Sequence, residues 1–190
     1  MAFDQLDSPV RTSRLMMRPA TAADGETTWQ YRRLASVAEW MTSASIDRAE
    51  YVTKVVKPDR LAKTLIFCRA GVVIGDLMLA VEDAWSQSEA SHQAKAVQAE
   101  LGSALHPEHE GHGYATEAVR GLIRISVEER PLRRVTVNCF AGNEPSWRLM
   151  EQVGMRRELH GVRSSLHRSG GWVDDFSYAL LAEEWRASRA

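Results

Sequence analysis

The longest periodic pattern in the chain lies between residues 113 and 130, where apolar residues recur at intervals of three and four. This spacing places them on one face of an α-helix, which predicts a central helix packed against other elements. Pro131 is expected to end the helix, because proline has no backbone N–H to donate. The apolar face consists of Ala115, Ala118, Val119, Leu122 and Ile125.

Shorter apolar and β-branched runs on both sides of this helix predict strands. Residues 64–70 and 72–83 flank Gly71, which predicts a tight hairpin of two antiparallel strands. Further strands are expected at 14–19, 99–106, 133–140, 155–167 and 172–181, and further helices at 24–37, 47–61 and 143–153. This order predicts a single mixed α/β sheet with helices packed on it.

Composition narrows the class of protein. The length of 190 residues favours one domain, and 44% hydrophobic with 26% charged residues is typical of a globular protein. A net charge of −1 provides no general attraction to nucleic acid or to an anionic membrane. Cys68 and Cys139 are too few for a disulfide framework. We find no signal-like start and no apolar run of about 18 residues, so we expect a cytoplasmic protein without a membrane partner.

The candidate chemistry is concentrated in residues 106–118, HPEHEGHGYATEA, where a strand enters a glycine loop that opens into the central helix. The first amides of a helix have no intrahelical acceptor, and the helix dipole adds about half a positive charge there. Gly111 and Gly113 let a ligand approach the backbone. These features favour a phosphate or pyrophosphate site, although a simple tight turn also uses such glycines. Thr116 replaces the third glycine of a dinucleotide fingerprint, and no Walker-type Gly-Lys-Ser/Thr is present.

Three motifs, in the right order, resemble the GCN5-related N-acetyltransferase (GNAT) superfamily. EGHGYATEA (110–118) is similar to its acetyl-CoA signature, in the form found in the RimJ/RimL-like ribosomal-protein N-terminal acetyltransferase branch. NEPSWRLMEQVGM (143–155) resembles the second signature of that branch, and TSRLMMRPATAAD (12–24) resembles its opening strand and turn. The resemblance implies an acetyltransferase domain over 12–186, an N-terminal extension over 1–11 and a C-terminal tail over 187–190.

The resemblance also implies the site. It suggests a largely antiparallel sheet that is splayed between two central strands, with acetyl-CoA as cosubstrate and its pantetheine arm between them. Glu110 departs from the Gln or Arg of the family, so its carboxylate is expected to point away from the pyrophosphate and cofactor affinity to be lower. The implied cofactor-binding residues are Leu105, His106, Glu110, Gly111, His112, Gly113, Tyr114, Ala115, Thr116, Asn143 and Ser146.

Direct attack of a primary amine on the thioester is the implied reaction, and it needs a neutral amine and a proton for the leaving thiolate. Neutralising a lysine amine at pH 7 costs about 4.6 kcal/mol, and an α-amine costs about 1 kcal/mol. Glu100, on a strand that lines the splay, is the candidate base, or else a solvated strand residue. Met150 stands where many relatives carry a tyrosine that protonates the leaving thiolate. Ser146 is therefore the candidate donor to the sulfur, or else a residue that positions the cofactor.

The acceptor stays open between a protein or peptide N-terminus, which the branch resemblance favours, and a small-molecule amine. A non-catalytic acyl-CoA-binding or regulatory module is the alternative, because of Glu110 and the missing tyrosine. His106, His109 and His112 do not predict a metal site, because a proline and two glycines keep them off a shared helix face. A homodimer that uses an unpaired edge strand near residues 172–181 is compatible with the sequence.

Overall fold

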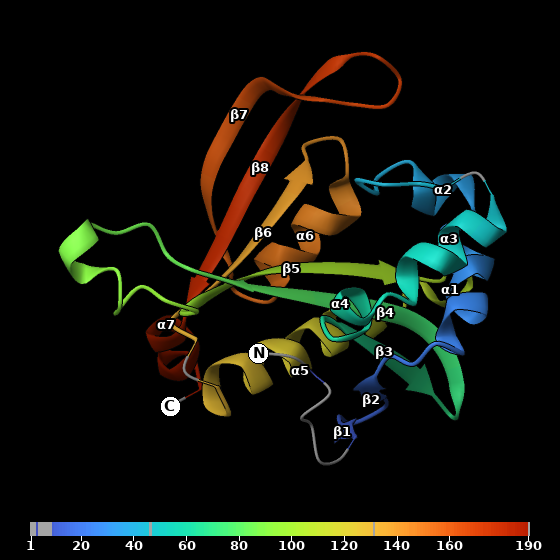
Figure 1. Ribbon diagram of the computed structural model, residues 1–190, viewed down its shortest axis with the longest axis horizontal. Coiled ribbons are helices and arrows are strands. Elements are labelled where there is room, and N and C mark those ends of the chain that lie inside the picture. The colour runs from blue at the N-terminus through green and yellow to red at the C-terminus, as the bar shows by residue number, and fades with distance from the viewer. Residues whose placement is uncertain (1–2, 4–8, 46, 131, 190) are drawn as a thin grey trace. The chain divides into compact units, whose positions relative to one another are not determined.

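The computed structural model describes residues 3, 9–45, 47–130 and 132–189 (Figure 1). Its strands pair in the order β1-β2-β3-β4-β5-β6-β8-β7, and the expected mixed, largely antiparallel sheet flanked by helices is confirmed. The strands are β1 (Val10–Arg11), β2 (Met16–Pro19), β3 (Thr64–Arg69), β4 (Val72–Glu82), β5 (Gln98–Leu105), β6 (Arg134–Phe140), β7 (Arg156–Leu166) and β8 (Trp172–Leu181). The helices are α1 (Asp24–Arg32), α2 (Ala35–Ala38), α3 (Arg48–Val55), α4 (Pro58–Leu61), α5 (Tyr114–Glu128), α6 (Glu144–Gln152) and α7 (Ala182–Ala187), with short 3-10 turns η2 (Ser88–Ala90) and η3 (Pro107–His109).

The contacts of the chain divide it into two compact units. The N-terminal unit contains residues 2–78 and 102–121, and the C-terminal unit contains residues 79–101 and 122–190. Each of β4, β5 and α5 contributes residues to both units.

The N-terminal unit is built on the antiparallel strands β1, β2, β3 and β4. The expected hairpin of β3 and β4 is confirmed, and its turn residues Ala70 and Gly71 have positive φ angles of 47° and 83°. At Gly75 in β4, a Cβ would overlap the Phe67 ring and the Ala104 carbonyl, so the packing there leaves no room for a side chain. The apolar core includes Met17, Leu65, Phe67, Ile74 and Leu77.

Two of the expected helices are each split in two. Residues 47–61 form α3 and α4 because Pro58 cannot continue a helix and restricts the residue before it. Lys57 is extended, with ψ at 139°, and Pro58 begins α4. Leu34 is also extended, with ψ at 135°, and it separates α1 from α2. Neither proline nor glycine marks that second break, so the hydrophobic spacing alone did not reveal it.

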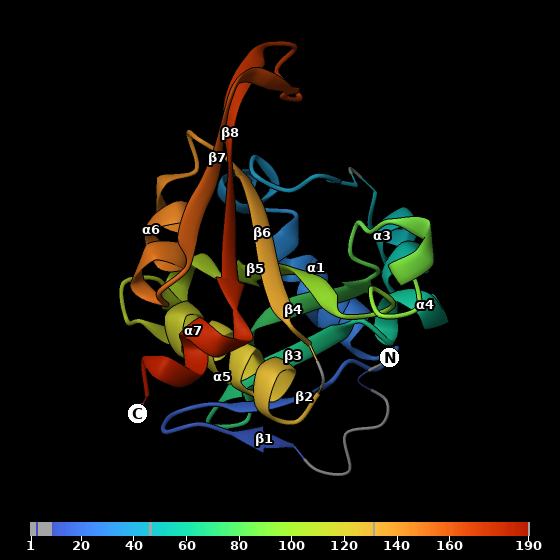
Figure 2. The ribbon, with the colours of Figure 1, turned by 90° about the vertical axis from the view of Figure 1, so that its left-hand side faces the viewer.

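In the C-terminal unit, β8 pairs with β6 on one side and with β7 on the other. Figure 2 shows β7 and β8 as one long two-stranded ribbon. The expectation of an unpaired edge near residues 172–181 is therefore wrong, because β7 ends the strand order. The parallel pairing of β5 with β6 joins residues 98–100 to residues 134–136, and both strands continue beyond this register.

The central helix is confirmed as α5, and Pro131, its expected terminator, lies outside the described residues. Helix α7 was not expected, and it follows β8 directly. The buried Trp185 of α7 donates its indole N–H to the Glu128 carboxylate of α5 at 3.1 Å. This contact ties α7 to the C-terminal end of α5 within the C-terminal unit.

The polar segment of residues 85–96 forms a loop that contains η2. Its ends meet where the Ala84 amide donates to the Ala94 carbonyl at 2.8 Å. Trp85 is 95% exposed, so this tryptophan does not belong to the core. In the described part of the chain, no helix combines the length and the hydropathy that crossing a membrane requires.

Candidate active site

The glycine loop of the N-terminal unit joins the end of β5 to the start of α5. Gly111 and Gly113 have φ angles of 76° and 74°, in the left-handed region that favours glycine. A Cβ at Gly111 would meet no atom within 4 Å, so that side of the loop is open. The Glu117 amide donates to the Gly113 carbonyl at 3.0 Å and closes the first turn of α5. The N-terminal amides of this 15-residue helix therefore lie next to the loop.

The sequence-predicted residues of this segment differ in exposure. Glu110, Gly111, His112 and Gly113 are exposed, and Tyr114 is buried. The half-buried members are Leu105, His106, Ala115 and Thr116. The structure therefore places these nine predicted residues in one continuous strand, loop and helix start, with the loop itself facing solvent.

His106 is held by its neighbours in the N-terminal unit. Its amide donates to the Ile74 carbonyl at 2.8 Å, and its carbonyl accepts from the His109 amide at 2.9 Å. Its Nδ1 accepts from the Glu108 amide at 3.2 Å. Burial and the nearby His106 lower the pKa of His109. Among the described residues, no group of three His, Cys, Asp or Glu side chains is arranged to hold a metal ion.

Glu117, in the first turn of α5, accepts four hydrogen bonds from the turn between β1 and β2. Its Oε1 accepts from the Thr12 hydroxyl (2.5 Å), the Ser13 hydroxyl (3.0 Å) and the Arg14 amide (2.7 Å). Its Oε2 accepts from Arg14 Nε at 2.6 Å. Burial by itself would raise the pKa of Glu117, but these hydrogen bonds outweigh it and lower the pKa to about 2. Sequence reasoning did not single out this contact, because its partners are far apart in the chain.

Two arginines of the N-terminal unit lie beside the buried Tyr114. The guanidinium carbon of Arg14 is 4.7 Å from the ring centroid, and that of Arg69 is 5.2 Å from it. Such cation–π contacts keep positive charge next to the ring. The ring of Tyr114, the first residue of α5, therefore has two cations beside it.

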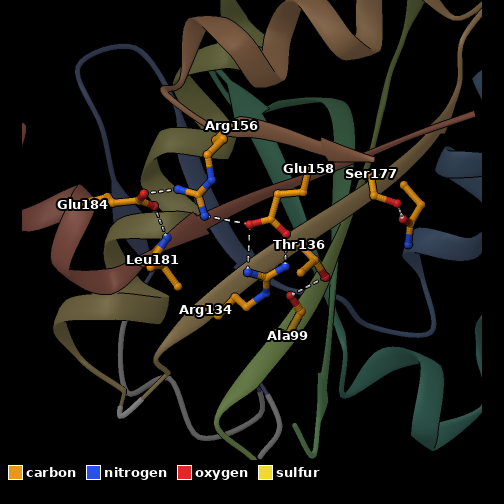
Figure 3. Close-up of polar contacts among 9 residues, drawn as sticks. Ala99, Arg134, Thr136, Arg156, Glu158, Ser177, Leu181 and Glu184 are labelled. Atoms are coloured by element: carbon orange, nitrogen blue, oxygen red, sulfur yellow. Dashed lines mark hydrogen bonds and ion pairs between the residues drawn. The ribbon is translucent and has the colours of Figure 1, made fainter. Parts of the chain in front are cut away.

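In the C-terminal unit, Glu100 belongs to a polar row across β5, β6 and β8. The Asn138 side-chain amide donates to Glu100 Oε1 at 3.1 Å, and the Ser177 hydroxyl donates to Asn138 Oδ1 at 2.6 Å. One residue pair further along, the Thr136 hydroxyl donates to the Ala99 carbonyl at 3.3 Å (Figure 3). Sequence reasoning did not single out Asn138 or Ser177, although strand alternation puts Asn138 on the same face as Thr136.

Ser146 and Asn143 lie at the start of α6. Asn143 is the N-cap, and its Oδ1 accepts from the Ser146 amide at 3.4 Å. Burial raises the pKa of the Cys139 thiol, and a hydrogen bond from the Ser146 side chain only partly offsets this effect. Cys139 is a free, half-buried thiol at the end of β6. Sequence reasoning found Asn143 and Ser146 but missed Cys139, which only the packing of α6 on β6 brings to them.

A row of ion pairs joins β6, β7 and α7, as Figure 3 shows. Glu158 pairs with Arg134 and Arg156, and Arg156 also pairs with Glu184. Glu184 in turn accepts from the Leu181 amide at 2.8 Å. Hydrogen bonds from Arg134 and Arg156 lower the pKa of Glu158 to about 2. These ion pairs link β6, β7 and α7 within the C-terminal unit.

Residues 14–156, which are 143 of the 190 residues, match the family described as the acetyltransferase (GNAT) domain. The chain belongs to this family. YdaF of Bacillus subtilis (strain 168), described provisionally as a ribosomal N-acetyltransferase, is 36% identical over 91 residues, which cover 48% of this chain and 49% of YdaF. The chain spans about half the length of the curated relatives it matches.

Solved structures of GNAT proteins have the same fold. An acetyltransferase of the GNAT family from Bacillus anthracis has a TM-score of 0.78 at 25% identity, over 93% of this chain and 99% of that chain. The ribosomal α-N-protein acetyltransferase RimL, in complex with coenzyme A, has a TM-score of 0.76 at 14% identity, also over 93% and 99%. The GNAT fold expected from the motifs is therefore confirmed.

Proposed function

We propose that this GNAT-family protein is an acetyl-CoA-dependent N-acetyltransferase that acetylates a primary amine. The observation that carries the proposal is the glycine loop, where two positive-φ glycines precede the N-terminus of a 15-residue helix. Pyrophosphate is the part of acetyl-CoA that such amides bind best. The open space at Gly111 supports the fit, because no atom lies within 4 Å of the place where a Cβ would be. Glu110 is exposed, so solvent screens its negative charge.

Acetyl-CoA supplies the acetyl thioester that the amine attacks. We assign the pyrophosphate to the amides of residues 111–116 and the pantetheine to the main chain of Leu105. We also assign His106 to the cofactor-binding segment; its amide donates to the Ile74 carbonyl, and its carbonyl accepts from the His109 amide. We assign Asn143 and Ser146, at the start of α6, to the cofactor as well.

Glu100 is the assigned base. Among the described residues, the hydrogen bond to its carboxylate comes from Asn138 and ends on Oε1. Since a carboxylate has about four acceptor sites, Glu100 keeps capacity for an ammonium or for a water that relays its proton. The proton of the acceptor amine moves to this carboxylate as the nitrogen becomes a nucleophile. Ser177 supports the arrangement because its hydroxyl orients the Asn138 amide.

Ser146 is the assigned donor to the leaving thiolate. Its side chain lies close enough to Cys139 to lower the pKa of that thiol, so Ser146 already neighbours a sulfur atom. The buried Met150 stands where many relatives carry the tyrosine that protonates the thiolate, and a methionine side chain has no proton to donate. Ser146 also remains a candidate for positioning the cofactor, and the two roles differ in whether its removal lowers kcat or raises KM.

The proposed acceptor is the α-amine of a protein or peptide. The provisional description of YdaF as a ribosomal N-acetyltransferase supports this choice. The energetics agree, because an α-amine costs about 1 kcal/mol to neutralise at pH 7 and a lysine about 4.6 kcal/mol. A small-molecule amine is the other acceptor class, and a panel of acceptors separates the two.

Cofactor binding and turnover test the proposal in sequence. At 100 times its dissociation constant, acetyl-CoA stabilises a protein by about 2.7 kcal/mol, so the melting temperature should rise. Thiol release is then measured with peptides that carry a free or a blocked N-terminus, and with small amines. No thermal shift at millimolar acetyl-CoA contradicts the cofactor assignment. Binding without thiol release across the panel supports a non-catalytic acyl-CoA-binding module instead.

A further inference from the structure

Arg14, in the turn between β1 and β2, contacts three residues at the start of α5 and in the loop before it. Arg14 pairs with the Glu117 carboxylate, and its Nη1 donates to the His112 carbonyl at 2.9 Å. Its guanidinium also lies over the Tyr114 ring, 4.7 Å from the centroid. All of these residues belong to the N-terminal unit. One side chain therefore contacts the loop, the first residue of the helix and the first helical turn.

We propose that Arg14 is a positioning residue for acetyl-CoA, which cancels the charge of Glu117 and fixes the His112 carbonyl so that the loop amides present a positive face to the pyrophosphate. This inference rests on the function proposed above. Arg14 does not need to touch the cofactor for this role, because it acts through Glu117 and the loop backbone.

Glu117 lies in the first turn of α5, next to the glycine loop. A carboxylate there stabilises the helix through the dipole, but it also repels an anion bound at the same helix end. The Glu117 side chain is only 13% exposed, so solvent and salt screen its charge poorly. The Arg14 guanidinium, 2.6 Å away, neutralises the carboxylate without displacing it. The helix amides then remain the dominant charge that faces the loop.

Arg14 also restrains the backbone of the glycine loop. His112 lies between two glycines with positive φ, a sequence with large conformational freedom when unbound. The bond from Arg14 to the His112 carbonyl restrains this residue before any ligand arrives. Restraint in the free protein lowers the entropy cost of binding, which raises affinity without changing the chemical step.

A purely mechanical link between the turn and the helix is the competing explanation, and neutralising the two charges singly and together separates the two explanations. A mechanical link predicts that Arg14→Gln and Glu117→Gln both weaken the loop and that the double variant is no better than either. Charge cancellation predicts that Arg14→Gln exposes the Glu117 charge and weakens binding, whereas Glu117→Gln removes the repulsion. The double variant should then recover affinity relative to Arg14→Gln alone.

The experiment measures the dissociation constant of coenzyme A by calorimetry, and kcat and KM by thiol release. We expect Arg14→Gln to weaken binding about tenfold, equivalent to about 1.4 kcal/mol, with kcat within about twofold of wild type. Arg14→Lys should recover part of the loss, and Arg14→Gln/Glu117→Gln should recover the part that comes from the Glu117 charge, because the bond to the His112 carbonyl stays broken. Arg11→Gln is the matched control, because it removes an exposed arginine of β1 that is three positions away; it should bind like wild type.

Hydrogen exchange in the cofactor-free protein provides an independent measurement. The amides of residues 111–115 should exchange faster in Arg14→Gln than in Arg11→Gln. If wild type binds coenzyme A and the double variant stays as weak as Arg14→Gln, the charge role is overturned. If Arg14→Gln binds like wild type, the whole inference fails while the proposed function stands. If wild type itself does not bind coenzyme A, the proposed function fails, and the cofactor role of Arg14 fails with it.

Discussion

Two glutamates, one in each unit, have very different hydrogen-bond surroundings. The Glu117 carboxylate in the N-terminal unit accepts four hydrogen bonds from the β1–β2 turn, and its pKa falls to about 2. Among the residues that the structure describes, the half-buried Glu100 in the C-terminal unit receives its hydrogen bond from the neutral side-chain amide of Asn138. Glu117 lies in the EGHGYATEA motif, and Glu100 lies on the strand that leads into that motif.

The difference indicates which carboxylate is available for chemistry. A carboxylate whose acceptor sites are filled by protein donors, and whose charge is matched by an arginine, is a poor proton acceptor at neutral pH. Glu117 therefore has a structural and electrostatic role, whereas Glu100 keeps the capacity that a general base needs. The hydrogen-bond donors that surround each carboxylate in the fold distinguish these two roles.

Replacing Glu100 should have the largest effect. Glu100→Gln should lower kcat about 100-fold with high-pKa amine acceptors, since a glutamine amide cannot accept the proton of the amine. Glu117→Gln is the matched comparison and should leave kcat within a few-fold of wild type. Thiol-release rates measured across acceptors of increasing pKa check this prediction. Equal kcat in Glu100→Gln and wild type across that series would remove Glu100 from the mechanism.

For the stability of the fold, Glu117→Gln should have a larger effect than Glu100→Gln. Glu117→Gln should lower the free energy of unfolding at pH 7 by about 2 kcal/mol, because it breaks hydrogen bonds to a charged group. Since folding depresses the pKa of Glu117 from 4.5 to about 2, its stabilisation is complete above pH 4.5 and is lost as the pH falls toward 2.

Urea denaturation of wild type and Glu117→Gln, at a series of pH values, measures this effect. The difference between the two proteins should shrink as the pH falls below 4.5. Glu100→Gln serves as the control, and its stability should differ little from that of wild type at any of these values. A constant difference between wild type and Glu117→Gln from pH 7 to pH 2 would contradict the ionised state of Glu117.

The smallest effect is expected at Glu158, whose pKa is also about 2 but whose surroundings differ. Its side chain is 28% exposed and pairs with Arg134 and Arg156, so solvent screens the interaction. Glu158→Gln should cost less than about 1 kcal/mol at pH 7, and the cost should fall in roughly 1 M salt. Thermal melts at two salt concentrations test this, and a salt-independent loss as large as that of Glu117→Gln would contradict it.

The fold was predictable where local physics decides it. Gly71 marked the hairpin, and the apolar spacing of residues 113–130 marked α5. The breaks at Leu34 and Lys57 were missed for different reasons. Pro58 predicts a break, but the hydrophobic spacing alone did not take it into account. At Leu34, neither proline nor glycine indicates a break.

The site was predictable to the same degree. The glycine loop and the start of α6 were found because each is one continuous motif. The partners Asn138, Ser177 and Cys139 were missed because they reach Glu100 and Ser146 only through strand pairing and packing in the C-terminal unit. Nothing in the order of residues states which strands become neighbours.

The sequence by itself determined the GNAT motifs, the positive-φ glycines and the helix that follows them, because backbone preference and hydrophobic period act over a few residues. Only the tertiary structure decided that Arg14 meets Glu117, 103 positions away, and that, within the described part of the chain, the Glu100 carboxylate is met by the Asn138 amide. A carboxylate's charge state and availability depend on the donors that surround it in space. Those donors are assembled by the sheet, and local sequence does not specify them.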